Sequence, residues 1–194
     1  ERNYFGKIEN KPNFKIIFLH AKEIIQRLGD GTIDIGVSGL DLLEESEKNL
    51  RNKIYIEKKL DFGSANLVIA VPDDWIDVQT VADLEEVSFD IRTKRNTRLR
   101  VATKYPNLTN DFFISKGITQ YKLIPSLGAT ETYPFIGSSE VISDISSTGK
   151  TLEDNNLRVL KDGLILKSTA CLFISKQSRK YKKSLLSDFY KLKR

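Results

Sequence analysis

Met is absent from this chain of 194 residues, and Cys and His each occur once. A single cysteine, Cys171, cannot form an internal disulfide, which excludes a disulfide-stapled scaffold and fits a reducing compartment. A catalytic thiol needs a partner base, and His20 has no evident link to Cys171, so we interpret Cys171 as a buried strand residue. No apolar run approaches the roughly 20 residues of a membrane span, so we expect no membrane association.

The first residue is Glu1, and we therefore expect further residues to precede it in the translated protein. For the same reason, the lack of a signal peptide decides nothing about targeting. With 29% charged and 40% hydrophobic residues, the composition is ordinary for a globular protein. A chain of this length can form one large domain or two small lobes with cores of their own.

The positive excess behind the net charge of +5 lies in the C-terminal tail. Residues 176–194 carry eight Lys or Arg and one acid, which leaves 23 basic and 25 acidic residues elsewhere. A second basic cluster is formed by Arg92, Lys94, Arg95, Arg98, Arg100 and Lys104. Either cluster is a solvated surface or a contact for nucleic acid, an acidic partner subunit or polyphosphate substrates. No known nucleic-acid-binding motif is present, so we expect no nucleic-acid partner.

The first part of the chain predicts a strand, a helix and a second strand. Residues 15–19 have the pattern of a buried strand, residues 21–28 carry one helical apolar stripe, and residues 32–37 form the next strand. A unit of this length predicts parallel pairing of its two strands. Gly36 and Gly39 either allow the strand to pack tightly on a helix or let a nucleotide lie over the backbone near Asp41.

The remaining pattern predicts two α/β lobes. We expect strands at 66–71, 99–103, 121–124, 141–145 and 171–175, and helices after Thr80, from Thr109 to Lys116, at 131–136 and at 176–193. We place the crossings between lobes near Pro72 and in the strand that begins at Cys171. The first lobe would then comprise residues 1–71 and 172–194, and the second lobe residues 72–171.

A candidate phosphate loop follows the expected strand at 141–145. Small residues end in Gly149, which can take a positive φ and lets a ligand approach the backbone closely. Thr151 is a suitable N-cap for the following segment, and backbone N–H groups at such a position bind phosphate. Asp144, at the end of the strand, can accept ribose hydroxyls or hold a divalent cation. The loop is not a Walker A motif, because Asp144 stands where that motif requires glycine, and an ordinary turn is the alternative.

The stretch from Glu131 onward resembles the signature of the ATP phosphoribosyltransferase family, which opens histidine biosynthesis. Every fixed position of that signature matches, at Glu131, Gly137, Ser139, Ile142, Asp144, Ile145, Thr148, Gly149, Thr151 and Leu152. Other stretches that resemble the family begin at Gly31, Phe62 and Arg100, so that the resemblance covers nearly the whole chain.

The resemblance implies a bilobal α/β fold similar to type II periplasmic binding proteins, and a transferase that joins phosphoribosyl pyrophosphate to N1 of ATP with Mg²⁺. It assigns the phosphoribosyl pyrophosphate loop to Asp144, Ser147, Thr148, Gly149, Lys150 and Thr151. It assigns nucleotide contacts to Gly39, Leu40, Asp41, Lys104 and Tyr105. No catalytic side chain and no dedicated metal ligand are implied, because alignment and charge stabilisation dominate this chemistry.

The resemblance also implies a cytoplasmic enzyme of the short form, in homo- and hetero-oligomers with a regulatory subunit similar to histidyl-tRNA synthetase. The family begins with a strand and a basic loop, and we expect that part of the first lobe to be missing from this sequence. At the segment where the family often has Arg, this chain offers His20 and Lys22. The alternative function is a bilobal solute-binding module that closes on an anion without catalysis.

Overall fold

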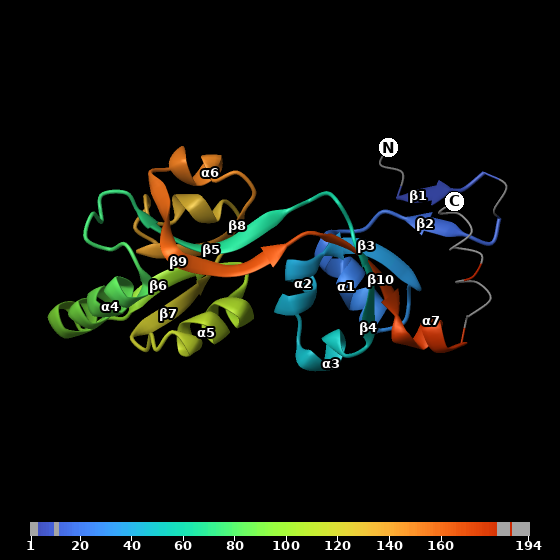
Figure 1. The fold of residues 1–194 in the computed structure, drawn as a ribbon, viewed down its shortest axis with the longest axis horizontal. Coiled ribbons are helices and arrows are strands. Elements are labelled where there is room, and N and C mark those ends of the chain that lie inside the picture. The colour runs from blue at the N-terminus through green and yellow to red at the C-terminus, as the bar shows by residue number, and fades with distance from the viewer. Residues whose placement is uncertain (1–3, 10–11, 182–186, 188–194) are drawn as a thin grey trace. The chain divides into compact units, whose positions relative to one another are not determined.

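The chain folds into two α/β units, which a computed structural model describes over residues 4–9, 12–181 and 187 (Figure 1). The first unit comprises Glu1–Leu60 and Ala170–Arg194, and the second comprises Asp61–Thr169. The chain passes between the units twice, which confirms the expected bilobal α/β class. No helix among the described residues is long and apolar enough to cross a membrane.

A three-stranded antiparallel sheet is the centre of the first unit. β10 (Ala170–Ser175) lies between β3 (Ile35–Gly39) and β4 (Ile54–Lys59). The helices of this unit are α1 (Ala21–Gly29), α2 (Leu40–Glu45), α3 (Lys48–Arg51) and α7 (Lys176–Tyr181). The apolar faces of α1 and α2 meet the sheet in a core that includes Ile25, Leu28, Leu43 and Phe173, and Leu50 of α3 packs against it.

The expected parallel pairing in the first unit is wrong. Residues 15–19 form only a short strand, β2 (Lys15–Ile17), which pairs antiparallel with β1 (Phe5–Lys7) in a separate two-stranded sheet. β2 is exposed rather than buried. Its local apolar content resembles that of a core strand, but the position beside β3 that a parallel unit requires is not taken by β2; β3 pairs with β10 instead.

The second unit contains a five-stranded mixed sheet in the order β7-β6-β8-β5-β9. The strands are β5 (Ala65–Pro72), β6 (Leu99–Thr103), β7 (Tyr121–Pro125), β8 (Val141–Ser146) and β9 (Leu157–Ser168). β6 pairs in parallel with both β7 and β8, whereas β5 is antiparallel to β8 and β9. The carboxyl ends of β6, β7 and β8 therefore lie at one edge of the sheet.

Both faces of this sheet are covered, which explains why its central strands are almost continuously apolar. On one face, Leu84 of α4 (Val81–Arg95) and Phe113 of α5 (Pro106–Ser115) pack against alternate strand residues such as Val101. On the other face, Leu152 of α6 (Lys150–Glu153) packs in a second cluster that includes Ala102. Figure 1 shows α4 and α5 on one side of the sheet and α6 on the other.

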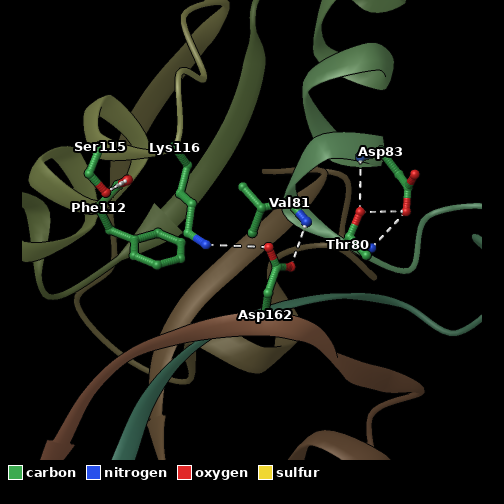
Figure 2. Close-up of polar contacts among 7 residues, drawn as sticks. All are labelled: Thr80, Val81, Asp83, Phe112, Ser115, Lys116 and Asp162. Carbon is green, nitrogen blue, oxygen red and sulfur yellow. Dashed lines mark hydrogen bonds and ion pairs between the residues drawn. The ribbon is translucent and has the colours of Figure 1, made fainter.

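Helix α4 begins at the Thr80-x-x-Asp83 motif, as the sequence predicts. The Thr80 hydroxyl accepts from the Asp83 N–H at 3.3 Å, and the Asp83 carboxylate accepts from the Thr80 N–H at 2.7 Å. Figure 2 shows this pair beside Asp162 of β9, which accepts from the Val81 N–H at 2.8 Å and lies 3.4 Å from the Lys116 ammonium. Asp162, which is distant from both helices in the sequence, thus links the start of α4 to the end of α5.

The first crossing expected near Pro72 is wrong. β5 ends at Pro72 but pairs along its length with β8 and β9, so it belongs wholly to the second unit, and the chain crosses at Leu60–Asp61. The second crossing, Thr169–Ala170, lies close to the expected one at Cys171. An apolar strand looks the same in sequence whether it crosses between units or sits inside one, and only its partners tell them apart.

Three helix expectations also need correction or completion. Thr109 does not cap a helix, because α5 begins three residues earlier, after Tyr105. Residues 131–136 form a single 3₁₀ turn, η1 (Thr130–Thr132), and turns rather than an α-helix. Of the expected helix at 176–193, the structure describes α7, and the apolar positions Leu185, Leu186, Phe189 and Leu192 lie outside the described residues.

Candidate functional site

The loops after three parallel strands form the candidate site of the second unit. Thr103, at the end of β6, pairs with Pro125 of β7 on one side and with Ser143 of β8 on the other. The loops that follow these strands therefore leave the sheet side by side. Ligands bind in open α/β sheets at this carboxyl edge, where backbone and side-chain groups of several loops converge.

The loop after β8 is the expected phosphate loop, and the structure gives it a defined shape. Gly149 is the N-cap of α6 and has a φ of 82°, in the left-handed region that favours glycine. Its N–H donates to the Ser146 hydroxyl at 3.0 Å. The helix starts at Lys150, so the expectation that Thr151 is its N-cap is wrong. Leu152 is buried in the core beneath and anchors the loop to the sheet.

The groups that a phosphate would meet on this loop point outward. The N–H groups of Ser147 and Thr148 make no hydrogen bond to a described residue, and both side chains are exposed. Lys150 and Thr151 are exposed as well. Asp144 is half-buried, and one of its oxygens accepts from the N–H of Ile145 at 2.8 Å. Free donors, a cation and one carboxylate thus share a single turn of chain.

Buried hydroxyls hold the neighbouring loop in place beside it. The fully buried Thr109 hydroxyl donates to the Ser143 hydroxyl of β8 at 2.8 Å, and it lies 3.4 Å from the Thr103 hydroxyl of β6. The Thr103 hydroxyl in turn accepts from the Tyr105 N–H at 2.9 Å. Thr109 therefore connects α5 to β6 and β8 through buried hydroxyl groups. Local sequence does not distinguish this role from that of a helix cap.

The two residues expected after β6 lie in different environments. Lys104 is exposed at the edge of the sheet, where its ammonium is accessible to an anion. Tyr105 is only 7% exposed and precedes α5, whose first residue is Pro106. Lys104 thus offers charge at this edge, and Tyr105 fixes the path of the chain into the helix.

The loop after β7 is a third part of this edge that the sequence analysis did not include. The Ser126 N–H donates to the Thr103 carbonyl at 3.0 Å, which joins this loop to the end of β6. The Ser126 and Thr130 hydroxyls are buried and lie 2.9 Å apart. Glu131 follows directly and is half-buried. One signal in the sequence could have identified this loop: Glu131, the first residue of the family signature, lies in the segment that follows the predicted strand at 121–124.

The expected nucleotide loop of the first unit is folded tightly on itself. Gly39 is the N-cap of α2, and a Cβ on Gly39 would lie 2.3 Å from an Asp41 carboxylate oxygen. Leu40 and Asp41 are buried. Only glycine therefore lets Asp41 fold back over the start of α2. Gly36 differs, because a Cβ there would lie 2.5 Å from Ile24 of α1, which favours the packing interpretation of that glycine.

Cys171 is confirmed as a buried strand residue, in β10 beside Ser38 of β3. Burial raises the pKa of its thiol, with Lys59 lowering and Asp41 raising it to smaller extents. A thiol kept protonated in this way is a poor nucleophile.

Comparison with known proteins matches almost the whole chain to one family. The family model described as ATP phosphoribosyltransferase matches residues 20–192. The ATP phosphoribosyltransferase of Brucella melitensis biotype 2 is 48% identical over 179 residues, which are 92% of this chain and 78% of that protein. That of Brucella anthropi is 47% identical over the same shares.

The chain belongs to the ATP phosphoribosyltransferase family. It is therefore a transferase, and the resemblance seen in the sequence is confirmed.

Solved structures show the same fold. The ATP phosphoribosyl transferase (HisG:HisZ) complex from Thermotoga maritima has a TM-score of 0.74 at 24% identity, over 96% of this chain and 83% of that one. The arginine-bound form of truncated ArgBP from T. maritima has a TM-score of 0.51 at 16% identity, over 91% and 76%. A fold related to solute-binding proteins is thus confirmed for this ATP phosphoribosyltransferase, while the family match disfavours a binding module without catalysis.

Proposed function

We propose that this chain transfers the phosphoribosyl group of phosphoribosyl pyrophosphate to N1 of ATP, giving phosphoribosyl-ATP and pyrophosphate, the first step of histidine biosynthesis. The observation that carries the proposal is the loop after β8, with its left-handed Gly149 and exposed donors, in a chain of the ATP phosphoribosyltransferase family. In the reaction, the bond from C1 of the ribose to pyrophosphate breaks as the bond from adenine N1 to C1 forms.

The phosphoribosyl pyrophosphate loop would hold the substrate through backbone and hydroxyl donors. The free N–H groups of Ser147 and Thr148 suit the oxygens of the 5-phosphate, and the Thr148 and Thr151 hydroxyls and Lys150 add donors and charge around it. Gly149 brings the backbone close, because no side chain stands between it and the ligand. Asp144 would accept the ribose hydroxyls, which aligns C1 for attack.

Magnesium fits this site as an ion carried by the substrate. No group of three or more acidic, His or Cys side chains that could hold a metal occurs among the described residues. Mg²⁺ needs only one or two carboxylates when substrate phosphates supply other ligands, and Asp144 has one carboxylate oxygen without a hydrogen bond to a described residue. When bound, the ion would neutralise charge on the departing pyrophosphate.

ATP would be bound by the two sets of residues expected to contact the nucleotide, which are Lys104 with Tyr105 and residues 39–41. Lys104 is exposed at the carboxyl edge of β6, where it suits the ATP phosphates, and Tyr105 supports its position. Gly39, Leu40 and Asp41 of the first unit stay a proposed nucleotide loop, in which the Asp41 carboxylate folds back against Gly39 at the start of α2.

A regulatory partner is part of the proposal. The T. maritima relative of this fold forms a HisG:HisZ complex. We infer that this chain also works in homo- and hetero-oligomers, with a regulatory subunit similar to histidyl-tRNA synthetase. Copurification with such a subunit would support this assembly, and full activity with histidine inhibition of the chain alone would contradict it.

Pyrophosphate release tests the reaction. The protein is assayed with ATP, phosphoribosyl pyrophosphate and Mg²⁺, with and without the regulatory subunit, beside the double variant Asp144→Ala and Thr148→Ala. We expect turnover that needs both substrates and is lost in the variant. Ligand-induced closure without turnover under any of these conditions would favour the solute-binding alternative.

A further inference from the structure

Leu127 is exposed to an unusual degree for its size and position. Its side chain is 97% exposed, the highest value among the large exposed hydrophobic residues that the structure describes. The backbone on either side is well anchored: the Ser126 N–H donates to the Thr103 carbonyl, and the buried Ser126 and Thr130 hydroxyls lie 2.9 Å apart. A fixed loop thus presents one leucine to solvent.

The register of the sheet places Leu127 at the candidate site. Thr103 pairs with Pro125, so Lys104 and Ser126 are neighbours at the edge, and Leu127 is the next residue along. The phosphate loop leaves β8 on the opposite side of β6. Along this edge, the three loops therefore present an apolar group, a cation and a set of phosphate donors in that order.

Each of these groups suits a different part of a nucleotide. Phosphates are bound by cations and N–H donors, whereas an aromatic base needs an apolar surface to cover its face. Within the first residues after each strand, at 104–105, 126–129 and 147–149, Leu127 is the one large apolar residue that is exposed, whereas the exposed Phe135 and Ile136 follow only after the turn η1. Single exposed leucines are common on protein surfaces, and it is the anchored position beside Lys104 that gives this one a specific partner.

We propose that Leu127 packs against the adenine ring of ATP. The inference rests on the proposed function and adds a base contact to it. The contact is apolar and faces the ring, so it contributes nothing to binding of the triphosphate.

Binding of two probes tests this contact. ATP and inorganic tripolyphosphate are titrated into the wild type, Leu127→Ala and Leu127→Met by calorimetry. For Leu127→Ala, we expect ATP to bind about tenfold more weakly, as the loss of an apolar contact of this size predicts, with tripolyphosphate unchanged. Leu127→Met should bind ATP as the wild type does, because methionine restores the apolar surface. Phe135→Ala, at a residue that is 87% exposed on the same segment, is the matched control and should change neither affinity.

Two results would overturn the inference. Unchanged ATP affinity in Leu127→Ala means that the side chain does not touch the base, and equal losses for ATP and tripolyphosphate mean that the loop has moved. Pyrophosphate release separates this inference from the proposed function. If the wild type neither releases pyrophosphate nor binds ATP, the proposed function and the base contact are both contradicted. If the wild type is active and Leu127→Ala binds ATP with the same affinity, only the base contact is contradicted.

Discussion

Replacing Gly149 by alanine separates the fold of the phosphate loop from its function. Gly149 has a φ of 82°, and a Cβ built on it meets nothing closer than a Glu153 oxygen at 4.0 Å. The fold therefore has room for the methyl group, and its cost is conformational. Gly117, just after α5, offers a matched control with a φ of 79° and no atom within 4 Å of its Cβ.

The cost in stability can be worked out from these angles. The left-handed region costs a non-glycine residue about 1–2 kcal/mol. Alanine also restricts the unfolded chain more than glycine does, which offsets about 0.4–1 kcal/mol of this loss in stability. Gly149→Ala and Gly117→Ala should each lower the free energy of unfolding by about 1 kcal/mol, which lowers Tm by about 2–4 °C in a protein of this size.

Activity should distinguish the two variants where stability does not. In Gly149→Ala the methyl group occupies the space through which the substrate phosphate approaches the backbone, so we expect KM for phosphoribosyl pyrophosphate to rise at least about tenfold. Gly117→Ala should keep the wild-type KM. The assay is pyrophosphate release at varied phosphoribosyl pyrophosphate, beside thermal unfolding of both variants. Equal KM values in the two variants would refute the assignment of this loop to the phosphate.

Three further outcomes follow from single residues. Asp144→Asn should lower kcat/KM in the pyrophosphate-release assay by about tenfold or more with little change in Tm, because in the proposed site this carboxylate accepts the ribose hydroxyls, and wild-type kcat/KM would contradict that role. Thr109→Val should lower the free energy of unfolding by about 1–3 kcal/mol in urea, since the buried Ser143 hydroxyl loses its donor, and a change below 0.5 kcal/mol would contradict the network. Hydrogen bonds from Thr80 lower the pKa of the Asp83 carboxyl in the folded protein, so the ionised carboxylate stabilises the fold above the ordinary pKa near 3.8, and this stabilisation is lost as pH falls through the folded pKa. The free energy of unfolding of Asp83→Asn should therefore depend less steeply on pH below about 4 than that of the wild type. An unchanged slope would count against this linkage.

Local features of this protein were readable from the sequence, because short stretches determine them. The Thr80-x-x-Asp83 motif predicts the start of α4, since the two side chains satisfy the free N–H groups of one helix end. Short runs rich in apolar residues predict β5, β6 and β8, because strands covered on both faces favour apolar residues on both sides. The candidate phosphate loop was predicted in the same way, from small residues, Gly149 and the family signature.

Strand partners were not readable, because they depend on residues far apart in the chain. β2 and β5 have the apolar content of strands, and only the folded chain shows that β2 pairs with β1 and that β5 lies inside the second unit. Thr109 was mistaken for a helix cap, since a threonine that caps and one that joins buried hydroxyls look alike in sequence.

The sequence by itself determined which family the chain belongs to, which residues are proposed to bind phosphate, and which carboxylate stands beside them. These follow from residue type and short spacing, which do not depend on distant partners. Only the tertiary structure decided that the loops after β6, β7 and β8 share one edge, and hence that Leu127 lies near Lys104. The physical reason is that parallel pairing brings together strand ends that are separated along the chain by whole helices.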